Sequence, residues 1–287
     1  MMPERTPAAR ELLAFYVEAG VDAVGGEQPV DRFADVAPAV TERGAGNPAE
    51  PAGRRPPLSP LPPKGPESRP APRTSAPPAL SLSPDAAVMA AREAARSAAS
   101  LDDLRAILDK FEGCALRATA TQLVFADGSP QGRVMFVGEA PGREEDLEGR
   151  AFVGRSGKLL DLMMRAIGLD RTGAYIANVI PWRPPGNRTP TPQETQICLP
   201  FIKRQIELAD PDILVTLGQP ATAALLNVHG ITKNRGRWFP YHTGTREIRA
   251  IASLHPAYLL RSPLQKRMAW RDFLMIRKAL AAPASNA

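Results

Sequence analysis

The order of apolar and polar residues divides the chain into parts with different periodicities. Residues 7–20 carry apolar side chains at helical spacing and end in Gly20, which predicts a short helix within an N-terminal segment 1–36. Residues 37–84 hold 14 of the chain's 31 prolines and few large apolar side chains. Because such a segment buries too little surface to offset the entropy of ordering, we predict a disordered linker there.

Helical spacing returns in residues 85–113, the predicted helical lead-in to the main domain. Ser83-Pro-Asp is typical of a helix start, and Ser100-Leu-Asp-Asp predicts a break followed by a second start. The main domain is predicted over residues 114–282, with a tail at 283–287. Its predicted strands are 133–137, 174–180, 213–217 and 247–253, and its predicted helices are 157–167, 193–209, 220–226 and 265–280.

This alternation of strands and helices is typical of an α/β fold, with a mainly parallel central sheet covered by helices on both faces. In such sheets ligands bind at the carboxyl ends of the strands. We therefore expect the chemistry just after Val137, around residues 178–183, and just after Ser253.

Composition and charge narrow the class of protein. No stretch approaches the roughly 18 uncharged apolar residues of a membrane span, and the first residues carry charges without the apolar run of a signal peptide. Two cysteines are too few to staple a secreted fold of this size, so we expect a cytoplasmic protein with no membrane partner. Residues 114–287 hold 23 Lys and Arg residues against 14 Asp and Glu residues. This excess favours a nucleic acid as partner, although charge that serves solubility alone explains it equally well.

Three segments at the predicted strand ends resemble the signature segments of family 4 (type-4) uracil-DNA glycosylases. They are Gly138-Glu-Ala-Pro-Gly-Arg-Glu-Glu-Asp146 with the following Gly149-Arg-Ala-Phe-Val-Gly-Arg-Ser-Gly-Lys-Leu-Leu160, Asn178-Val-Ile-Pro-Trp-Arg-Pro-Pro-Gly-Asn-Arg188, and His255-Pro-Ala-Tyr-Leu-Leu-Arg261. Their common order argues against a chance match. The resemblance, from about Cys114 to Leu280, implies a three-layer αβα uracil-DNA glycosylase-like fold. It also implies an enzyme that flips uracil from DNA and hydrolyses its N-glycosidic bond in base excision repair.

The chemistry of that reaction asks for the residue types found in these segments. A flipped base needs an aromatic platform and hydrogen bonds to its Watson–Crick edge, for which Phe152 and Asn178 are the candidates. The turn that contains Gly138 and Ala140 is expected to bring main-chain amides close to uracil and to a water molecule. His255 is the expected partner of uracil O2, because the departing base carries negative charge.

Two carboxylates, Glu139 and Asp146, are our candidates for orienting water and stabilising the positively charged sugar, with Glu145 a lesser one. Phosphate contacts are expected from residues near the start of a helix and from Arg261. Pro256, Tyr258 and Leu259 are expected to enter the minor groove and fill the gap in the base stack. The helix-start candidates are Arg155, Ser156 and Lys158.

The chain departs from the family pattern at the iron–sulfur site. Family 4 enzymes usually hold a [4Fe–4S] cluster on four cysteines, but here Phe111 and Trp182 stand at two of those positions and only Cys114 and Cys198 remain. We expect no metal and no cofactor, with apolar packing in place of the cluster. A cluster whose missing ligands are supplied in some other way is the alternative.

The predicted partner is DNA that contains uracil, single-stranded or double-stranded, and the protein is expected to act as a monomer. The sequence indicates no partner for the N-terminal helix. Loss of the cluster keeps a second interpretation open, in which the same fold is a non-catalytic or weakly catalytic protein that binds uracil or abasic sites in DNA. A nucleotide-binding regulator with no role on DNA is the third; it predicts little salt dependence on DNA.

Overall fold

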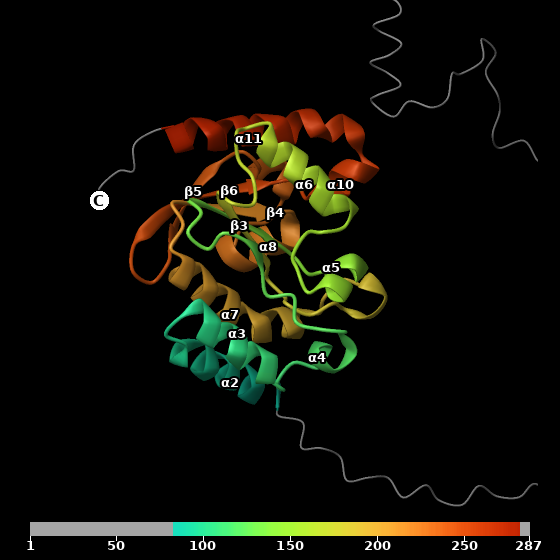
Figure 1. Ribbon diagram of the computed structural model, residues 1–287, viewed down its shortest axis with the longest axis vertical. Helices are drawn as coiled ribbons and strands as arrows, with labels where there is room; N and C mark the ends of the chain where they lie inside the picture. Colours follow the sequence, from blue (N-terminus) through green and yellow to red (C-terminus); the bar gives the residue numbers. More distant parts are fainter. Residues whose placement is uncertain (1–82, 282–287) are drawn as a thin grey trace, which may run out of the picture. The chain divides into compact units, whose positions relative to one another are not determined.

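A computed structural model describes residues 83–281 of the chain (Figure 1). The predicted helix at 7–20, nearly all of the predicted linker and the tail lie outside the described residues. Among the described helices, none is both long enough and apolar enough to cross a membrane.

The centre of the described part is a sheet of six strands in the order β1-β3-β2-β4-β6-β5. The four inner strands run parallel, and each edge strand runs antiparallel to its neighbour. The strands are β1 (Asp127–Gly128), β2 (Val134–Gly138), β3 (Ala174–Asn178), β4 (Ile213–Leu217), β5 (Trp238–His242) and β6 (Glu247–Ser253). The predicted α/β fold with a mainly parallel sheet is confirmed.

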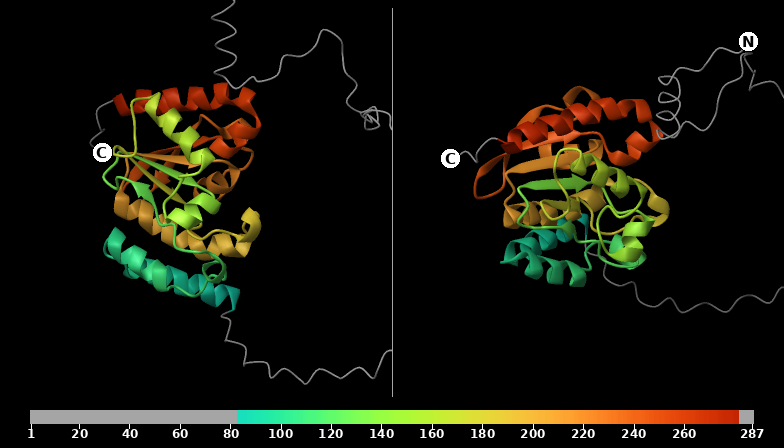
Figure 2. Two further views of the ribbon diagram at one scale, coloured as in Figure 1. Left: turned by 45° about the vertical axis from the view of Figure 1, so that its right-hand side comes forward. Right: turned by 45° about the horizontal axis from the view of Figure 1, so that its top comes forward.

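Helices cover both faces of the sheet, as Figure 2 shows: α6 (Arg155–Arg165) and α11 (Lys266–Ala281) lie on one face and α7 (Pro192–Ala209) lies on the other. The lead-in helices α2 (Pro84–Ser97) and α3 (Leu101–Lys110) pack against the outer side of α7. The remaining helices are α4 (Leu116–Thr119), α5 (Arg143–Glu148), η1 (Pro185–Asn187), α8 (Gln219–Leu226), α9 (Ile231–Asn234), α10 (Pro256–Arg261) and η2 (Pro263–Gln265).

Strand β2 shows why the sequences of the inner strands are continuous apolar runs. Val134 and Phe136 enter the core beneath α6 and α11, whereas Met135 and Val137 enter the core beneath α7. All of these side chains are inaccessible to solvent. A parallel strand covered on both faces needs apolar side chains on both, because its alternate residues point to opposite sides.

Helix boundaries follow the predicted starts closely. The hydroxyl of Ser83 accepts a hydrogen bond from the amide of Ala86 at 3.3 Å, and the hydroxyl of Ser100 accepts one from the amide of Asp103 at 3.1 Å. The apolar pattern did not predict the edge strands β1 and β5 or the short helices α5 and α10. These elements are short and lack a long apolar period, which is the signal that identified the others.

Candidate active site

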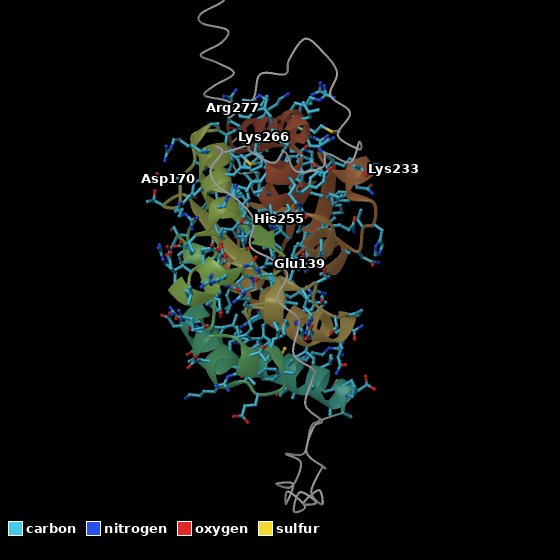
Figure 3. The ribbon with its side chains drawn as sticks, turned by 90° about the vertical axis from the view of Figure 1, so that its right-hand side faces the viewer. Glu139, Asp170, Lys233, His255, Lys266 and Arg277 are labelled. Atoms are coloured by element: carbon cyan, nitrogen blue, oxygen red, sulfur yellow. The ribbon has the colours of Figure 1, made fainter. Side chains whose placement is uncertain are left out.

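The carboxyl ends of β2, β3 and β6 open into one cavity of about 640 Å³. Gly138 and Asn178 are register partners at the ends of β2 and β3, and His255 follows the end of β6 by two residues. Figure 3 shows Glu139 and His255 near one another on the face that carries the cavity. The volume lies in the range of small-molecule sites, and its position is the one expected for a parallel sheet.

Asn178 and Phe152 meet above Gly138. A Cβ atom built on Gly138 would lie 2.6 Å from Oδ1 of Asn178 and 2.6 Å from Cζ of Phe152. Only glycine therefore leaves room for this approach. Both side chains line the cavity, yet Asn178 is only 5% exposed and Phe152 only 4%. The end of β3 and the turn before α6 thus place a carboxamide and an aromatic ring side by side.

His255 completes this group as the N-cap residue of α10. Its ring centroid lies 5.5 Å from that of Phe152, with an angle of 31° between the two planes. The amide of Ala257 donates a hydrogen bond to Nδ1 of His255 at 3.1 Å, so the neutral ring carries its proton on Nε2. Burial, together with the nearby charge of Arg261, lowers the pKa of His255 to about 4. His255 is therefore a neutral hydrogen-bond donor at pH 7.

Of the two candidate carboxylates, only Glu139 lines the cavity. Burial raises the pKa of the Glu139 carboxyl above its usual value. Asp146 is directed elsewhere: its carboxylate accepts bonds from the amide and the hydroxyl of Thr121, each at 2.8 Å, and lies 3.8 Å from Nη1 of Arg183. The catalytic role predicted for Asp146 is wrong, because α5 directs its side chain toward Thr121 and away from the cavity.

Glu145, the lesser candidate, is a structural clamp. One carboxylate oxygen accepts from the amide of Gly142 at 3.0 Å, and the other accepts from the amide of Gly154 at 2.9 Å. The side chain is 5% exposed. Glu145 thereby joins the turn after β2 to the start of α6. Because the Gly142 amide already donates to Glu145, the prediction that every amide of this turn is available to a ligand is wrong. Ala140, in the same turn, does line the cavity.

The prediction that Pro256, Tyr258 and Leu259 enter the minor groove is wrong, because these residues form part of helix α10. Leu259 is 1% exposed and packs with Leu254 and Ala269, Pro256 is buried, and Tyr258 is partly buried against the same cluster. A buried side chain is not free to fill a gap in a base stack. Leu260 is instead the exposed residue, at 36%, and it lines the cavity.

The cationic rim is larger than sequence reasoning indicated. Of the predicted phosphate contacts, Arg155, Ser156 and Arg261 line the cavity, whereas Lys158 is exposed one turn further along α6 and does not. Arg143 and Arg188 also line the cavity and were not predicted, although both belong to the signature segments. Segment 184–190 also reaches the cavity: Pro184, Asn187, Arg188, Thr189 and Pro190 all line it. Their position after a strand end was the available signal.

The two cysteines lie away from this cavity, in the core between the sheet and the lead-in helices. Cys198 donates a hydrogen bond to Sγ of Cys114 over 4.0 Å, and this bond together with burial raises the pKa of Cys198 well above its usual value. Trp182 is 2% exposed and belongs to the same apolar cluster, against which Phe111 packs. The ring of Phe111 meets that of Phe201 edge-on, with centroids 4.9 Å apart.

These residues do not fit a [4Fe–4S] cluster, which is normally held by four thiolates. At two of the four expected cysteine positions stand Phe111 and Trp182, whose aromatic rings pack into the core and carry no sulfur ligand. Within residues 83–281, no three His, Cys, Asp or Glu side chains are grouped so that they could hold a metal ion.

The fold and the cavity define a class: a three-layer α/β protein in which a carboxamide, an aromatic ring, a neutral imidazole and a carboxylate line one cavity at the carboxyl ends of the strands. Residues 125–274 match the family described as the uracil DNA glycosylase superfamily. The chain belongs to this superfamily and, within it, to the type-4 uracil-DNA glycosylases.

Three relatives illustrate the match. The type-4 uracil-DNA glycosylase of Thermotoga maritima is 45% identical over 157 residues, which are 53% of this chain and 79% of that protein. The protein of the same name from Archaeoglobus fulgidus is 38% identical over 182 residues, 62% of this chain and 92% of that one. The protein of that name from Sulfurisphaera tokodaii is 38% identical over 190 residues, 64% of this chain and 86% of that one.

Proposed function

We propose that this protein is a uracil-DNA glycosylase, a hydrolase that extrudes uracil from DNA, cleaves its N-glycosidic bond and leaves an abasic site for base excision repair. The observation that carries the proposal is that Phe152, Asn178 and His255, from three distant segments, line one cavity. The names of the relatives support the same activity.

Recognition of uracil rests on the carboxamide of Asn178 and the ring of Phe152. Uracil presents an N3–H donor beside an O4 acceptor, and a carboxamide offers the matching acceptor and donor. Cytosine presents the reverse arrangement, so a carboxamide held in one orientation rejects it. The base stacks on Phe152, which lies directly beside Asn178 above Gly138.

Bond cleavage is served by His255 and Glu139. As the bond breaks, negative charge develops on uracil O2, and Nε2–H of the neutral His255 donates a hydrogen bond there. Positive charge develops on the sugar, and the ionised carboxylate of Glu139 stabilises it and orients the attacking water. Each role follows from a side chain that faces the cavity.

The DNA partner is held by the rim of the cavity. Arg143, Arg155 and Arg261 supply charge for phosphates, and Arg155 does so beside the free amides that begin α6. Leu260 lies among them and is suited to fill the gap left by a flipped base. We propose that both single-stranded and double-stranded uracil-containing DNA are substrates, because the cavity is open at this rim.

The test uses a labelled oligonucleotide that contains one uracil, with an otherwise identical oligonucleotide that contains cytosine as the control substrate. Alkali after incubation converts an abasic site into a strand break, so the proposal expects a break only at uracil. Asn178→Asp is expected to weaken the preference for uracil, whereas Asn227→Asp, an exposed site at the end of α8, is the matched control.

A non-catalytic sensor of uracil or abasic sites is the second candidate, favoured by the loss of two cluster ligands. It predicts that the wild-type protein binds an abasic oligonucleotide tightly and leaves the uracil oligonucleotide intact. That pair of results would replace the glycosylase proposal.

On the cofactor, we infer that the protein works without an iron–sulfur cluster. Support comes from the packing of Trp182 and Phe111 and from the hydrogen bond that Cys198 makes to Cys114. Anaerobically purified wild-type protein is expected to be colourless and free of stoichiometric iron. The double variant Phe111→Cys, Trp182→Cys restores four cysteines and is the positive control for cluster uptake. A brown wild-type preparation with about four irons per chain would overturn the inference.

A further inference from the structure

The base platform Phe152 has a backbone conformation that needs outside support. Its φ of 53° lies in the left-handed region, which a bulky non-glycine residue rarely adopts. Such conformations persist where the surrounding structure holds them, and they concentrate at functional sites. Whatever holds this peptide therefore also sets the direction of the aromatic ring.

We propose that Arg171 is the positioning residue that holds Phe152 in this conformation and so aligns the platform for the flipped base; this rests on the proposed function. Arg171 lies in the loop between α6 and β3, and it is not among the residues that line the cavity. It acts on the base only through Phe152.

The guanidinium of Arg171 binds two successive carbonyl groups of the platform segment. Nη1 donates to the carbonyl oxygen of Ala151 at 3.0 Å, and Nη2 donates to the carbonyl oxygen of Phe152. These carbonyls belong to the two peptide groups on either side of the Phe152 Cα, so holding both with one planar group restricts rotation about φ and ψ of Phe152. The planar fork of arginine can do this, whereas the single ammonium of lysine cannot hold the same geometry.

Arg171 is itself fixed by two carboxylates from other elements. Nη1 lies 2.5 Å from Oδ2 of Asp127 on β1, and Nε donates to Oδ1 of Asp161 on α6 at 2.9 Å. The Arg171 side chain is 23% exposed, and that of Asp127 is 16% exposed. The donors of one side chain thus tie the platform to an edge strand and to a helix, and each partner limits the motion of the others.

Helix α6 closes the other side of the same peptide. A Cβ atom built on Gly157 would lie 1.7 Å from the carbonyl oxygen of Phe152 and 2.1 Å from its carbonyl carbon. The first turn of α6 therefore packs directly on this peptide, and only glycine permits it. The peptide is enclosed between Gly157 and the guanidinium, so a small change at Arg171 is passed to the ring, which lies against Asn178 and His255.

A double-mutant cycle between Arg171→Lys and Phe152→Ala, measured as the single-turnover rate of uracil release, tests the proposal. Arg171→Lys alone is expected to slow release by about 10- to 100-fold, the size expected for a misplaced contact group. In the Phe152→Ala background the same change is expected to have almost no further effect, because the platform it positions is already gone. Equal slowing in both backgrounds would overturn the proposal.

Arg246→Lys is the matched control, because Arg246 also binds carboxylates and carbonyl groups, those of Asp210, Pro211 and Asp212, away from the cavity. It is expected to leave the rate unchanged. Amide hydrogen exchange gives a readout that needs no activity: Arg171→Lys should speed exchange in residues 151–157, and Arg246→Lys should not. Unchanged exchange in that segment would overturn the proposal, whereas an inactive wild-type protein with the expected exchange would overturn only the glycosylase function.

Discussion

The segment that starts at the last residue of β3 contributes to two regions of the molecule, which differ in how they use polar groups. At one end, Asn178 faces the cavity beside a neutral His255 and a partly buried Glu139. Four residues further on, Trp182 enters the core beside Cys114 and Cys198. Polar side chains line the cavity, whereas the region around the two cysteines is filled by the aromatic rings of Phe111 and Trp182.

The two regions are held in place by different interactions. Backbone pairing between β2 and β3 sets the position of Asn178, since Gly138 and Asn178 are register partners and the amide of Val179 donates to the carbonyl of Gly138 at 2.9 Å. The other end of this segment, at Trp182, is held by the burial of large apolar side chains around Cys114 and Cys198. Apolar packing at native density can supply that support without a metal.

The largest effect should come from breaking the packed region. Trp182→Ala removes an almost fully buried ring and is expected to lower the free energy of unfolding by about 3–5 kcal/mol. Urea denaturation followed by circular dichroism measures it. Trp270→Ala, at a ring that is 41% exposed on α11, is the matched control and should cost far less. Equal losses would show that the cysteine region is not a packed core.

The next effect concerns the cavity. Glu139→Ala and His255→Ala are each expected to slow uracil release by about 100-fold or more, because each removes a group that stabilises charge in the transition state. Unfolding free energy is expected to change little for Glu139→Ala, because burial, and no hydrogen bond, accounts for the shifted pKa of its carboxyl. Asp146→Ala makes the comparison sharper, because it should lower stability through Thr121 more than it lowers the rate in folded protein.

A smaller effect is expected from pH. The folded-state pKa of His255 is about 4, below the usual 6.5, so the unfolded chain binds more protons between these values. Above about pH 6.5 this group leaves the free energy of unfolding independent of pH. As pH falls from 6.5 toward 4, it lowers the free energy of unfolding by up to about 1.4 kcal/mol per pH unit. Denaturation at pH 5 and pH 7 measures the slope, which His255→Gln should flatten. If the rate of uracil release fell as pH was lowered through about 6.5, the prediction that His255 is neutral at that pH would be contradicted.

The smallest effect should separate the two leucines of α10. Leu260→Ala is expected to slow cleavage of double-stranded DNA by several-fold and to change stability by less than about 0.5 kcal/mol, because the side chain is exposed. Leu259→Ala should instead lower the unfolding free energy by about 2–5 kcal/mol. If Leu259→Ala acted on DNA alone, the helical assignment of α10 would be contradicted.

The sequence predicted the long elements and the convergence of the three segments, because parallel strands end at one edge and each segment follows a strand. It did not predict which side chains of α5 and α10 face the cavity. Those helices have six residues each, too few for a periodic pattern, so their phase is set by what they pack against. Asp146 and Leu259 were misplaced for that reason.

By itself, the amino-acid sequence determined the α/β fold, the strand ends that carry Asn178 and His255, and the replacement of two cysteines by Phe111 and Trp182. These follow from local periodicity and residue identity. Only the tertiary structure decided that Glu139 faces the cavity, that Glu145 clamps two loops, and that Arg171 holds Phe152. Each of these depends on partners brought together by packing, and residues such as Asp127 and Arg171, 44 positions apart, leave no local signal in the chain.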